Sequence, residues 1–497
     1  MRVTLVQAPV YDRQSPSLAL AYLSSVLAEN DYDVNIVDLN RDFFKSVDEN
    51  EKFESFFKKF RVNYINQWYQ IDIDYFVNVL FYEKFKKHSI TEDEYGFINS
   101  IVDNFVGKIL QKTPDVIGFS VYQSSALFSL LTAREIKKKK PETVIIFGGP
   151  DCLNSKEEFF LKQDYIDFVV FGEGEVTIVE LLDSLEMGVC YPESDGVMWK
   201  NENKIYRGKN RELIKDLDRI PYPNFDLFNL ADYNKVWQLP VLMTRGCTGN
   251  CYFCFENNYY RCFRKRNPAH VFYEIKRNLR KYNIYYYAFN DSLINGDLYQ
   301  LEKFCDLVIK ENLNIKWWAQ VRPRRMPFDL LKKMRRAGCY HLFFGIESAS
   351  QKVLNDMRKG TKVEIIKETL RLSKKAGFKI TSFWMFGYPT ETDKDFKMTC
   401  DFVKENKKNI DFVYATTLIL RPGSIIYSDI DKFDIKLPEF TKKYPEEICS
   451  LFPDLNFYYL YYWTSQEGRN NADVRHKRYG FFKDHARKIG LSVDEGI

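Results

Sequence analysis

Three closely spaced cysteines are the residues of this 497-residue chain best suited to chemistry. Cys247, Cys251 and Cys254 form the pattern C-x3-C-x2-C, and Gly246 and Gly249 allow the segment to curl around a compact group. Thiolates at such spacing are typical ligands of iron–sulfur clusters and of zinc. In a [4Fe–4S] cubane, three thiolates leave one iron without a protein ligand, and that iron can bind a small molecule.

A zinc site is the alternative interpretation of these cysteines. Zinc would need a fourth ligand, which Cys262 or His270 could supply. Zinc sites usually combine two C-x2-C arms, and the sequence has no second arm. Six further cysteines are scattered singly and are expected to be small core residues: Cys152, Cys190, Cys305, Cys339, Cys400 and Cys449. The pattern therefore favours the cluster.

The cysteines directly follow the first of a series of predicted strands. These strands are Pro240–Thr244, Tyr285–Asn290, Ile315–Gln320, His341–Gly345, Lys379–Phe386 and Phe412–Ile419. Helical segments fill the gaps between them, which predicts a partial parallel (β/α)6 barrel. Because such barrels carry their chemistry at the carboxyl ends of the strands, the cysteines are expected at the active end.

Strands and helices also alternate in the first 200 residues of the chain. The predicted strands are Val3–Gln7, Val34–Asp38, Val116–Ser120, Val144–Phe147 and Asp167–Phe171. This alternation predicts a Rossmann-like parallel sheet covered by helices on both faces. Glycine-rich turns follow two of the strands, Gly148-Gly149-Pro150 and Gly172-Glu173-Gly174-Glu175. They are either tight turns or part of a ligand site at the carboxyl edge of the sheet.

The chain is too long for one ordinary domain, and its pattern predicts an α/β protein in several parts. We expect a Rossmann-like domain at 1–200 with a helical insertion at about 41–112. A connector is expected at 201–236, where Pro221 and Pro223 lie, followed by the barrel at 237–430 and a small helical C-terminal region at 431–497.

Charge and hydropathy exclude several classes of function. The 73 Lys and Arg and 68 Asp and Glu residues leave a net charge of +5, which is too small and too dispersed to predict a nucleic-acid partner. The basic run Lys137–Lys140 is interpreted as a solvated helix end. No apolar stretch is long enough to span a bilayer, and the N-terminus resembles a strand rather than a signal peptide. A cytoplasmic location is expected.

The cysteine segment resembles the radical S-adenosylmethionine (SAM) superfamily, whose motif C-x3-C-x2-C has an aromatic residue, here Phe253, before the third cysteine. The resemblance implies a [4Fe–4S] cluster whose open iron binds SAM, and whose electron releases a 5′-deoxyadenosyl radical. It also implies SAM contacts from Phe253, from Asp291 after the second barrel strand, from Glu347 after the fourth and from Gly387 after the fifth. An electron donor such as flavodoxin or ferredoxin is expected.

The first domain resembles the cobalamin-binding domain that precedes the barrel in one large class of this superfamily. The resemblance is carried by Gly118-Phe119-Ser120 and by the two glycine-rich turns. It implies that cobalamin contacts Ser120, Gly148, Gly149, Gly172 and Glu173. The D-x-H-x-x-G motif is absent, so no protein histidine is expected to ligate cobalt. The resemblance covers about residues 1–430, without the insertion and the C-terminal region.

Together these resemblances imply a cobalamin-dependent radical SAM enzyme that methylates an unactivated carbon of a small molecule or natural-product intermediate, with methylcobalamin as the methyl donor. The alternative is cyclisation, rearrangement or C–C coupling, with cobalamin absent or in another role. A zinc-containing binding protein without turnover is the alternative from a different class. The sequence does not identify the substrate, although its 33 Tyr and 41 Phe residues favour an apolar or ring-bearing one.

Overall fold

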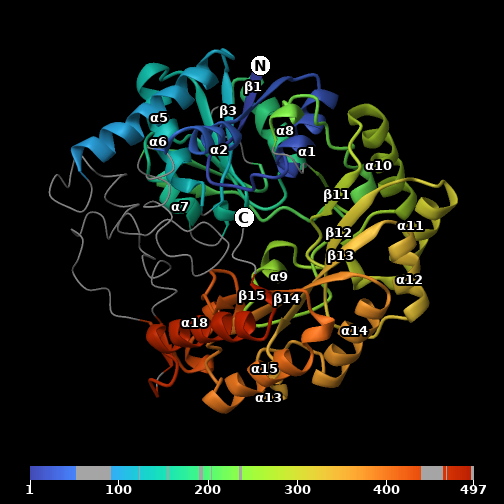
Figure 1. Cartoon of the computed structure of the whole chain (residues 1–497). Coiled ribbons are helices and arrows are strands. Elements are labelled where there is room, and N and C mark those ends of the chain that lie inside the picture. The colour runs from blue at the N-terminus through green and yellow to red at the C-terminus, as the bar shows by residue number, and fades with distance from the viewer. Residues whose placement is uncertain are drawn as a thin grey trace. The chain divides into compact units, whose positions relative to one another are not determined.

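The computed structural model describes residues 1–51, 91–122, 124–153, 156–189, 194–202, 204–233, 238–437, 463–465 and 467–493. The described residues form two compact units (Figure 1). The first contains residues up to 215 and those from 219 to 233, and the second contains residues 216–218 and those from 238 onward. The predicted helical insertion lies mostly outside the described residues, and its described flanks are the helices α2 (Leu39–Glu49) and α5 (Glu92–Leu110).

The first unit is built on a seven-stranded sheet with the order β2-β1-β3-β4-β5-β6-β7. Its strands are β1 (Arg2–Gln7), β2 (Asp33–Asp38), β3 (Val116–Ser120), β4 (Val144–Gly148), β5 (Phe168–Val170), β6 (Val197–Asn201) and β7 (Lys204–Arg207). The first five are parallel, which confirms the predicted Rossmann-like sheet. In the order 2-1-3-4-5, the connection after β1 leads to one side of the sheet and the connection after β3 leads to the other side. Open parallel sheets bind ligands at the carboxyl ends of two strands related in this way.

An antiparallel hairpin extends this sheet beyond its parallel part. β6 pairs with β5, and β7 pairs with β6. The rings of Trp199 and Tyr206 stack across the hairpin with centroids 5.7 Å apart. Such aromatic pairs stabilise neighbouring strands, so the sheet continues into residues 204–207, where the sequence suggested a connector.

Helices cover the parallel strands. They are α1 (Leu18–Glu29), α6 (Ala126–Lys139), α7 (Lys156–Leu161) and α8 (Gly174–Glu186), together with α2 and α5. α1 packs against α8, and α5 packs against α6 (Figure 1). Their ends follow known capping rules, since Thr91 and Glu94 form a capping box at the start of α5. None of the described helices is long and apolar enough to cross a bilayer.

The lysines at the end of α6 are paired with carboxylates. Lys137 lies 2.9 Å from Asp167, and Lys139 lies 3.0 Å from Asp103. Lys138 pairs with Glu135 on the same helix. The run is therefore a solvated helix end, as the sequence predicts, because the neighbouring acids balance its charge.

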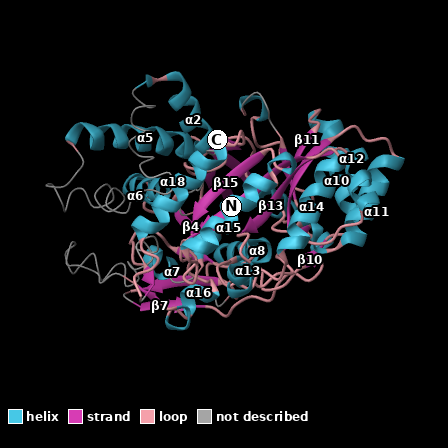
Figure 2. Cartoon of the chain, turned by 60° about the horizontal axis from the view of Figure 1, so that its bottom comes forward, coloured by secondary structure: helices cyan, strands magenta, loops and turns pink. Residues whose placement is uncertain are grey.

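The second unit has a seven-stranded parallel sheet with the order β18-β15-β14-β13-β12-β11-β8. Its strands are β8 (Leu239–Val241), β11 (Tyr286–Phe289), β12 (Lys316–Val321), β13 (Cys339–Glu347), β14 (Lys379–Phe386), β15 (Phe412–Thr417) and β18 (Ser492–Val493). The first six lie side by side in chain order, with helices between them (Figures 1 and 2). This confirms the predicted partial (β/α)6 barrel.

The barrel helices lie on the outer side of these strands. They are α10 (Pro268–Tyr282), α11 (Leu298–Lys310), α12 (Phe328–Arg336), α14 (Val363–Lys375) and α15 (Asp393–Glu405). Along β13, Leu342, Phe344 and Ile346 are fully buried, whereas Phe343, which alternates with them, and Glu347, which ends the strand, are not. Because side chains alternate along a strand, Phe343 is on the face opposite the packed helices. Glu347 ends the strand after a register shift and has φ +72°.

The described part of the C-terminal region contains one long helix, α18 (Ala472–Lys488), which packs on α15, β14 and β15. The short strands β16 (Ile435–Lys436) and β17 (Thr464–Ser465) pair antiparallel, and β18 extends the barrel sheet next to β15. The C-terminal residues are thus part of the same unit as the barrel.

Candidate active site

The cysteine loop is closed at its base by a two-stranded ladder. β9 (Thr244–Arg245) pairs antiparallel with β10 (Arg264–Lys265), so the chain returns next to its starting point after the cysteines. Gly246 follows β9 with φ +80°, and a Cβ there would lie 2.5 Å from the carbonyl oxygen of Cys262. Only glycine permits this close approach, which explains why the loop begins with one.

The three thiols gather within this loop. The backbone N–H of Gly249 donates to Cys247 Sγ at 3.3 Å, and the N–H of Cys254 donates to the carbonyl of Cys251 at 3.1 Å. Burial, followed by the charge of Glu256, raises the pKa of the Cys254 thiol to about 12, and the other two cysteines add to this shift. Thiols that share poorly solvated surroundings favour the thiolate only when a metal is bound.

The donor set fits a [4Fe–4S] cluster better than a single ion. No three His, Cys, Asp or Glu side chains of the described residues converge on one ion-sized point. A cubane presents each thiolate with its own iron, so the sulfur atoms need not converge in that way. Of the two possible fourth zinc ligands, Cys262 is exposed, and His270 Nδ1 lies 3.0 Å from Asp218.

Asp291, which the sequence predicts to contact SAM, holds the start of the cysteine loop. It is fully buried, and its oxygens accept hydrogen bonds from the N–H groups of Met243 and Thr244 and from the Thr244 hydroxyl at 2.6 Å. Burial raises the pKa of Asp291 to about 6. Its hydrogen bonds position the segment that leads to Cys247, and its contact with SAM stays a prediction.

Glu347 and Lys359 form an ion pair on the inner side of the barrel. Lys359 Nζ lies 2.8 Å from Glu347 Oε1, and the side chains are only 7% and 14% exposed. Burial opposes the charge of Lys359, but Glu347 and Cys251 outweigh that effect, so the pKa of Lys359 is raised. Lys359 also lies 5.7 Å from the ring centroid of Phe253. Two predicted SAM-binding residues, Phe253 and Glu347, therefore meet around one buried lysine.

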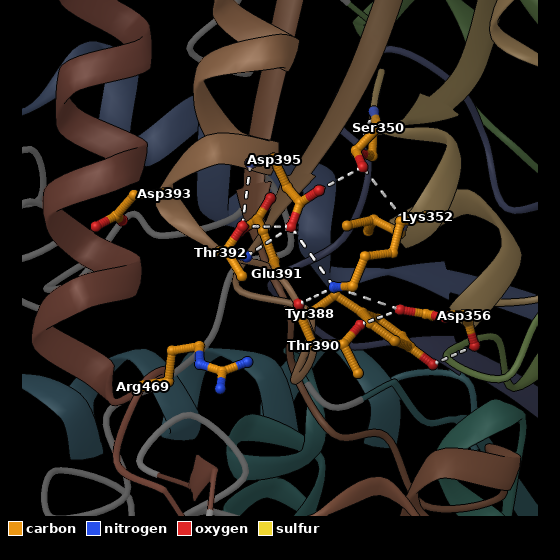
Figure 3. Close-up of polar contacts among 12 residues, drawn as sticks. Ser350, Lys352, Asp356, Tyr388, Thr390, Glu391, Thr392, Asp393, Asp395 and Arg469 are labelled. Carbon is orange, nitrogen blue, oxygen red and sulfur yellow. Dashed lines mark hydrogen bonds and ion pairs between the residues drawn. The ribbon is translucent and has the colours of Figure 1, made fainter.

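Gly387 begins a tight turn after β14 that is held by a buried carboxylate. It has φ +83°, and its N–H donates to Glu391 Oε2 at 2.6 Å. Burial raises the pKa of Glu391 to about 7. Around this turn, Asp395 accepts from Ser350 at 2.6 Å, and the Tyr388 hydroxyl donates to the carbonyl of Asp356 at 2.9 Å (Figure 3).

Residues of the C-terminal region complete the support of this turn. Arg478 of α18 donates to Glu391 at 2.9 Å and to Asn470 at 2.7 Å. The Asn470 amide donates to backbone carbonyls of the turn, among them that of Tyr388 at 2.9 Å. A Cβ at Gly387 would lie 2.2 Å from Cγ of Arg475. The turn is therefore shaped by buried side chains far along the sequence.

Sequence reasoning missed several residues of this region, including Arg322, Lys359, Asn470 and Arg478. Arg322 directly follows β12, the one central barrel strand without a predicted site residue, so a polar residue at each strand end would have indicated it. Lys359, Asn470 and Arg478 have no comparable signal, because none of them lies directly after a barrel strand.

In the first unit, the predicted cobalamin residues lie at the carboxyl ends of β3, β4 and β5. Ser120 pairs with Gly148 in neighbouring strands. Gly149 has φ +109°, and a Cβ there would lie 2.8 Å from the carbonyl oxygen of Val121. Gly149 thus serves the close approach of two protein segments, whatever else it contacts.

The second glycine-rich turn of this unit is more open. Gly172 has φ +82°, and no heavy atom lies within 4 Å of the position of a Cβ. Its neighbour Glu173 is buried, and its carboxylate accepts from the N–H of Ile214 at 2.9 Å. Glu173 therefore anchors the connector, and Gly172 leaves free space at the edge of the sheet.

The second unit is a partial parallel barrel with a three-cysteine loop after its first strand, and the first unit is an open, mostly parallel sheet. This is the architecture expected of a radical SAM enzyme with a cofactor-binding domain. Residues 241–403 match the radical SAM superfamily, and residues 85–182 match the B12 binding domain. The chain is 30% identical to an uncharacterized methyltransferase of Pyrococcus horikoshii over 67% of this chain and 73% of that protein.

Two further relatives extend the comparison. The chain is 26% identical to the anaerobic magnesium-protoporphyrin IX monomethyl ester cyclase of Synechocystis over 52% of this chain, and it spans about half of that protein, 53%. It also shares its fold with the radical SAM methyltransferase TsrM of Kitasatospora setae, with a TM-score of 0.67 and 15% identity over 98% of this chain and 91% of TsrM.

The chain belongs to the radical SAM superfamily, in the group that carries a B12 binding domain before the barrel. It is thus an enzyme whose cofactors are a [4Fe–4S] cluster, SAM and cobalamin. As a radical SAM enzyme, it needs a reductant.

Proposed function

We propose that this enzyme transfers a methyl group to an unactivated carbon of a small molecule in a cobalamin-dependent radical reaction. The observation that carries the proposal is the presence of both family domains in one chain that is 30% identical to an uncharacterized methyltransferase. When bound, the cluster and SAM supply a 5′-deoxyadenosyl radical, and cobalamin supplies the methyl group.

The barrel residues have separate tasks in this proposal. Cys247, Cys251 and Cys254 hold the cluster, and Asp291 fixes the backbone that leads into their loop. Glu347 would accept hydrogen bonds from the ribose hydroxyls of SAM, and the Lys359 ammonium 2.8 Å away orients its carboxylate. Gly387 and Phe253 border the same cofactor.

The turns at the edge of the first sheet bind cobalamin in this proposal. Gly148, Gly149 and Gly172 present backbone without side chains, which suits the close approach of a flat corrin. Ser120 lies at the end of the neighbouring strand. Glu173 acts through its bond to Ile214, because that bond holds the connector beside the turn. No histidine ligates the cobalt.

A second candidate function is ring formation or another C–C coupling without net methylation. Its support is the 26% identity to the anaerobic magnesium-protoporphyrin IX monomethyl ester cyclase. For both functions the substrate is a small molecule, a flavodoxin or ferredoxin supplies the electron, and no nucleic acid takes part. Both fit a cytoplasmic enzyme.

Isotope labelling distinguishes the two functions. The anaerobically reconstituted enzyme is supplied with cobalamin, a low-potential reductant, SAM with a deuterated methyl group, and small-molecule extract of cells that contain the protein. Methylation predicts S-adenosylhomocysteine and 5′-deoxyadenosine together, and a product that has gained the labelled methyl group. Deoxyadenosine alone, with a product of unchanged carbon count, would favour the cyclase-like reaction. The same mixture with the three cysteines changed to alanine is the control and should form no deoxyadenosine.

A further inference from the structure

A guanidinium group lies against the cysteine loop inside the second unit. Arg322 follows β12, and its Nη1 donates a hydrogen bond to Cys251 Sγ at 3.6 Å. Cys251 is the most buried of the three cysteines, with 6% of its surface exposed. A charged donor therefore contacts the sulfur of the most buried of the three cysteine residues.

The surrounding backbone is shaped to hold Arg322 in this position. The fully buried Asn295 accepts from the N–H of Arg322 and donates to its carbonyl, each at 3.0 Å. A Cβ at Gly249 would lie 1.4 Å from Nη1 of Arg322, and one at Gly360 would lie 3.4 Å from Nη2. Gly249 thus leaves the space that the guanidinium occupies, within the cysteine motif itself.

The charge of Arg322 is directed to the thiol rather than to an acid. Within the part of the chain that the structure describes, no carboxylate pairs with Arg322. The other cation near Cys251, Lys359, is paired with Glu347 at 2.8 Å. Arginine keeps its proton at every accessible pH, so this positive charge is permanent.

We infer that Arg322 raises the reduction potential of the cluster held by Cys251. The inference rests on the proposed role of Cys251 as a cluster ligand. Reduction adds negative charge to the cluster and its thiolates, and an N–H donor with a positive charge stabilises that form more than the oxidised one. Arg322 would thereby make the first electron transfer easier for a protein reductant.

The test is a redox titration of the full chain, reconstituted with iron and sulfide without oxygen and followed by the paramagnetic signal of the reduced cluster. Arg322→Met should lower the midpoint potential, making reduction about tenfold less favourable, which is about 59 mV for one electron. Arg322→Lys retains the charge and should recover part of the shift. Arg325→Met is the matched control, because Arg325 is an exposed arginine on the same segment.

An unchanged potential in Arg322→Met at full iron content would overturn the inference, as would an equal shift in Arg325→Met. Weaker SAM binding at unchanged potential would assign Arg322 to the cofactor instead and also overturn it. If Arg322→Met loses iron, Gly249→Ala displaces the guanidinium without removing it and should lower the potential in the same direction. A wild-type chain that binds no iron would instead refute the cluster assignment of the proposed function.

Discussion

The two parallel sheets of this enzyme use their carboxyl edges in different ways. At the barrel edge, charged side chains meet in specific pairs, such as Glu347 with Lys359 and Glu391 with Arg478. At the ends of β4 and β5 in the first sheet, glycine backbone prevails, and the neighbouring acid Glu173 holds its own connector. The barrel edge is thus defined by side-chain chemistry, and the other edge by the space that missing side chains leave.

The difference suggests how each edge responds to mutation. Removing a side chain from the barrel edge removes a cofactor ligand or leaves that side chain's ion-pair partner unpaired, so the effect falls on one cofactor. Adding a side chain to the first sheet fills space, so the effect depends on what already occupies that space. The predictions below test this contrast, from the largest expected effect to the smallest.

Replacing Cys247, Cys251 and Cys254 together with alanine should abolish the cluster. About four irons per chain are expected in the reconstituted wild type and almost none in the variant, as measured by iron analysis and visible absorption. Corrin binding should survive, because the proposed cobalamin site lies on the first sheet and includes none of the three cysteines. Cys262→Ala is the control within the same loop and should retain its iron. Iron retained in the triple variant would refute the assignment.

Gly172→Leu should reduce the cobalamin content several-fold while the protein stays folded. Its left-handed backbone makes a side chain cost about 1–2 kcal/mol, but the space beyond is open. Gly149→Leu should unfold more readily, because a Cβ there would lie 2.8 Å from a backbone oxygen.

The matched control for Gly172 is Gly188→Leu, at the end of α8. Gly188 has φ +78° and equally open surroundings, so it carries the same backbone strain away from the edge of the sheet. Corrin absorbance per chain and the thermal midpoint measure the two effects. Equal corrin content in the Gly172 and Gly188 variants would remove Gly172 from the cobalamin site.

Glu391 should make the barrel less stable as the pH rises from about 4.5 to 7. Its pKa is raised to about 7 in the folded chain, so the folded state binds the proton more tightly than the unfolded state does. Its stabilising effect is complete below the unfolded pKa and is lost as the pH rises through the folded one. The expected loss is on the order of 1–3 kcal/mol.

Glu391→Gln isolates this effect, because a glutamine retains the acceptor for Gly387, and Arg478 retains Asn470 as a partner. Between pH 5.5 and 7.5 the thermal midpoint of the wild type should fall further than that of the variant. Parallel curves would show that Arg478 keeps Glu391 ionised throughout.

The sequence by itself determined the five parallel strands of the first sheet, the six barrel strands and the location of the cysteine loop, but not β6, β7 and β18. Strand patterns are local, so Val116–Ser120 and Lys379–Phe386 have the same bounds in the structure as in the prediction. The three cysteines lie within one short segment, so their common role is visible without the fold.

Only the tertiary structure decided which polar residues support the site. Asp291 bonds to Thr244, 47 residues away, Arg322 to Cys251 across 71 residues, and Arg478 to Glu391 across 87. Such contacts depend on how strands and helices pack, and no local pattern contains that information. The sequence therefore shows which atoms could bind the cluster, whereas the fold determines which charges surround them.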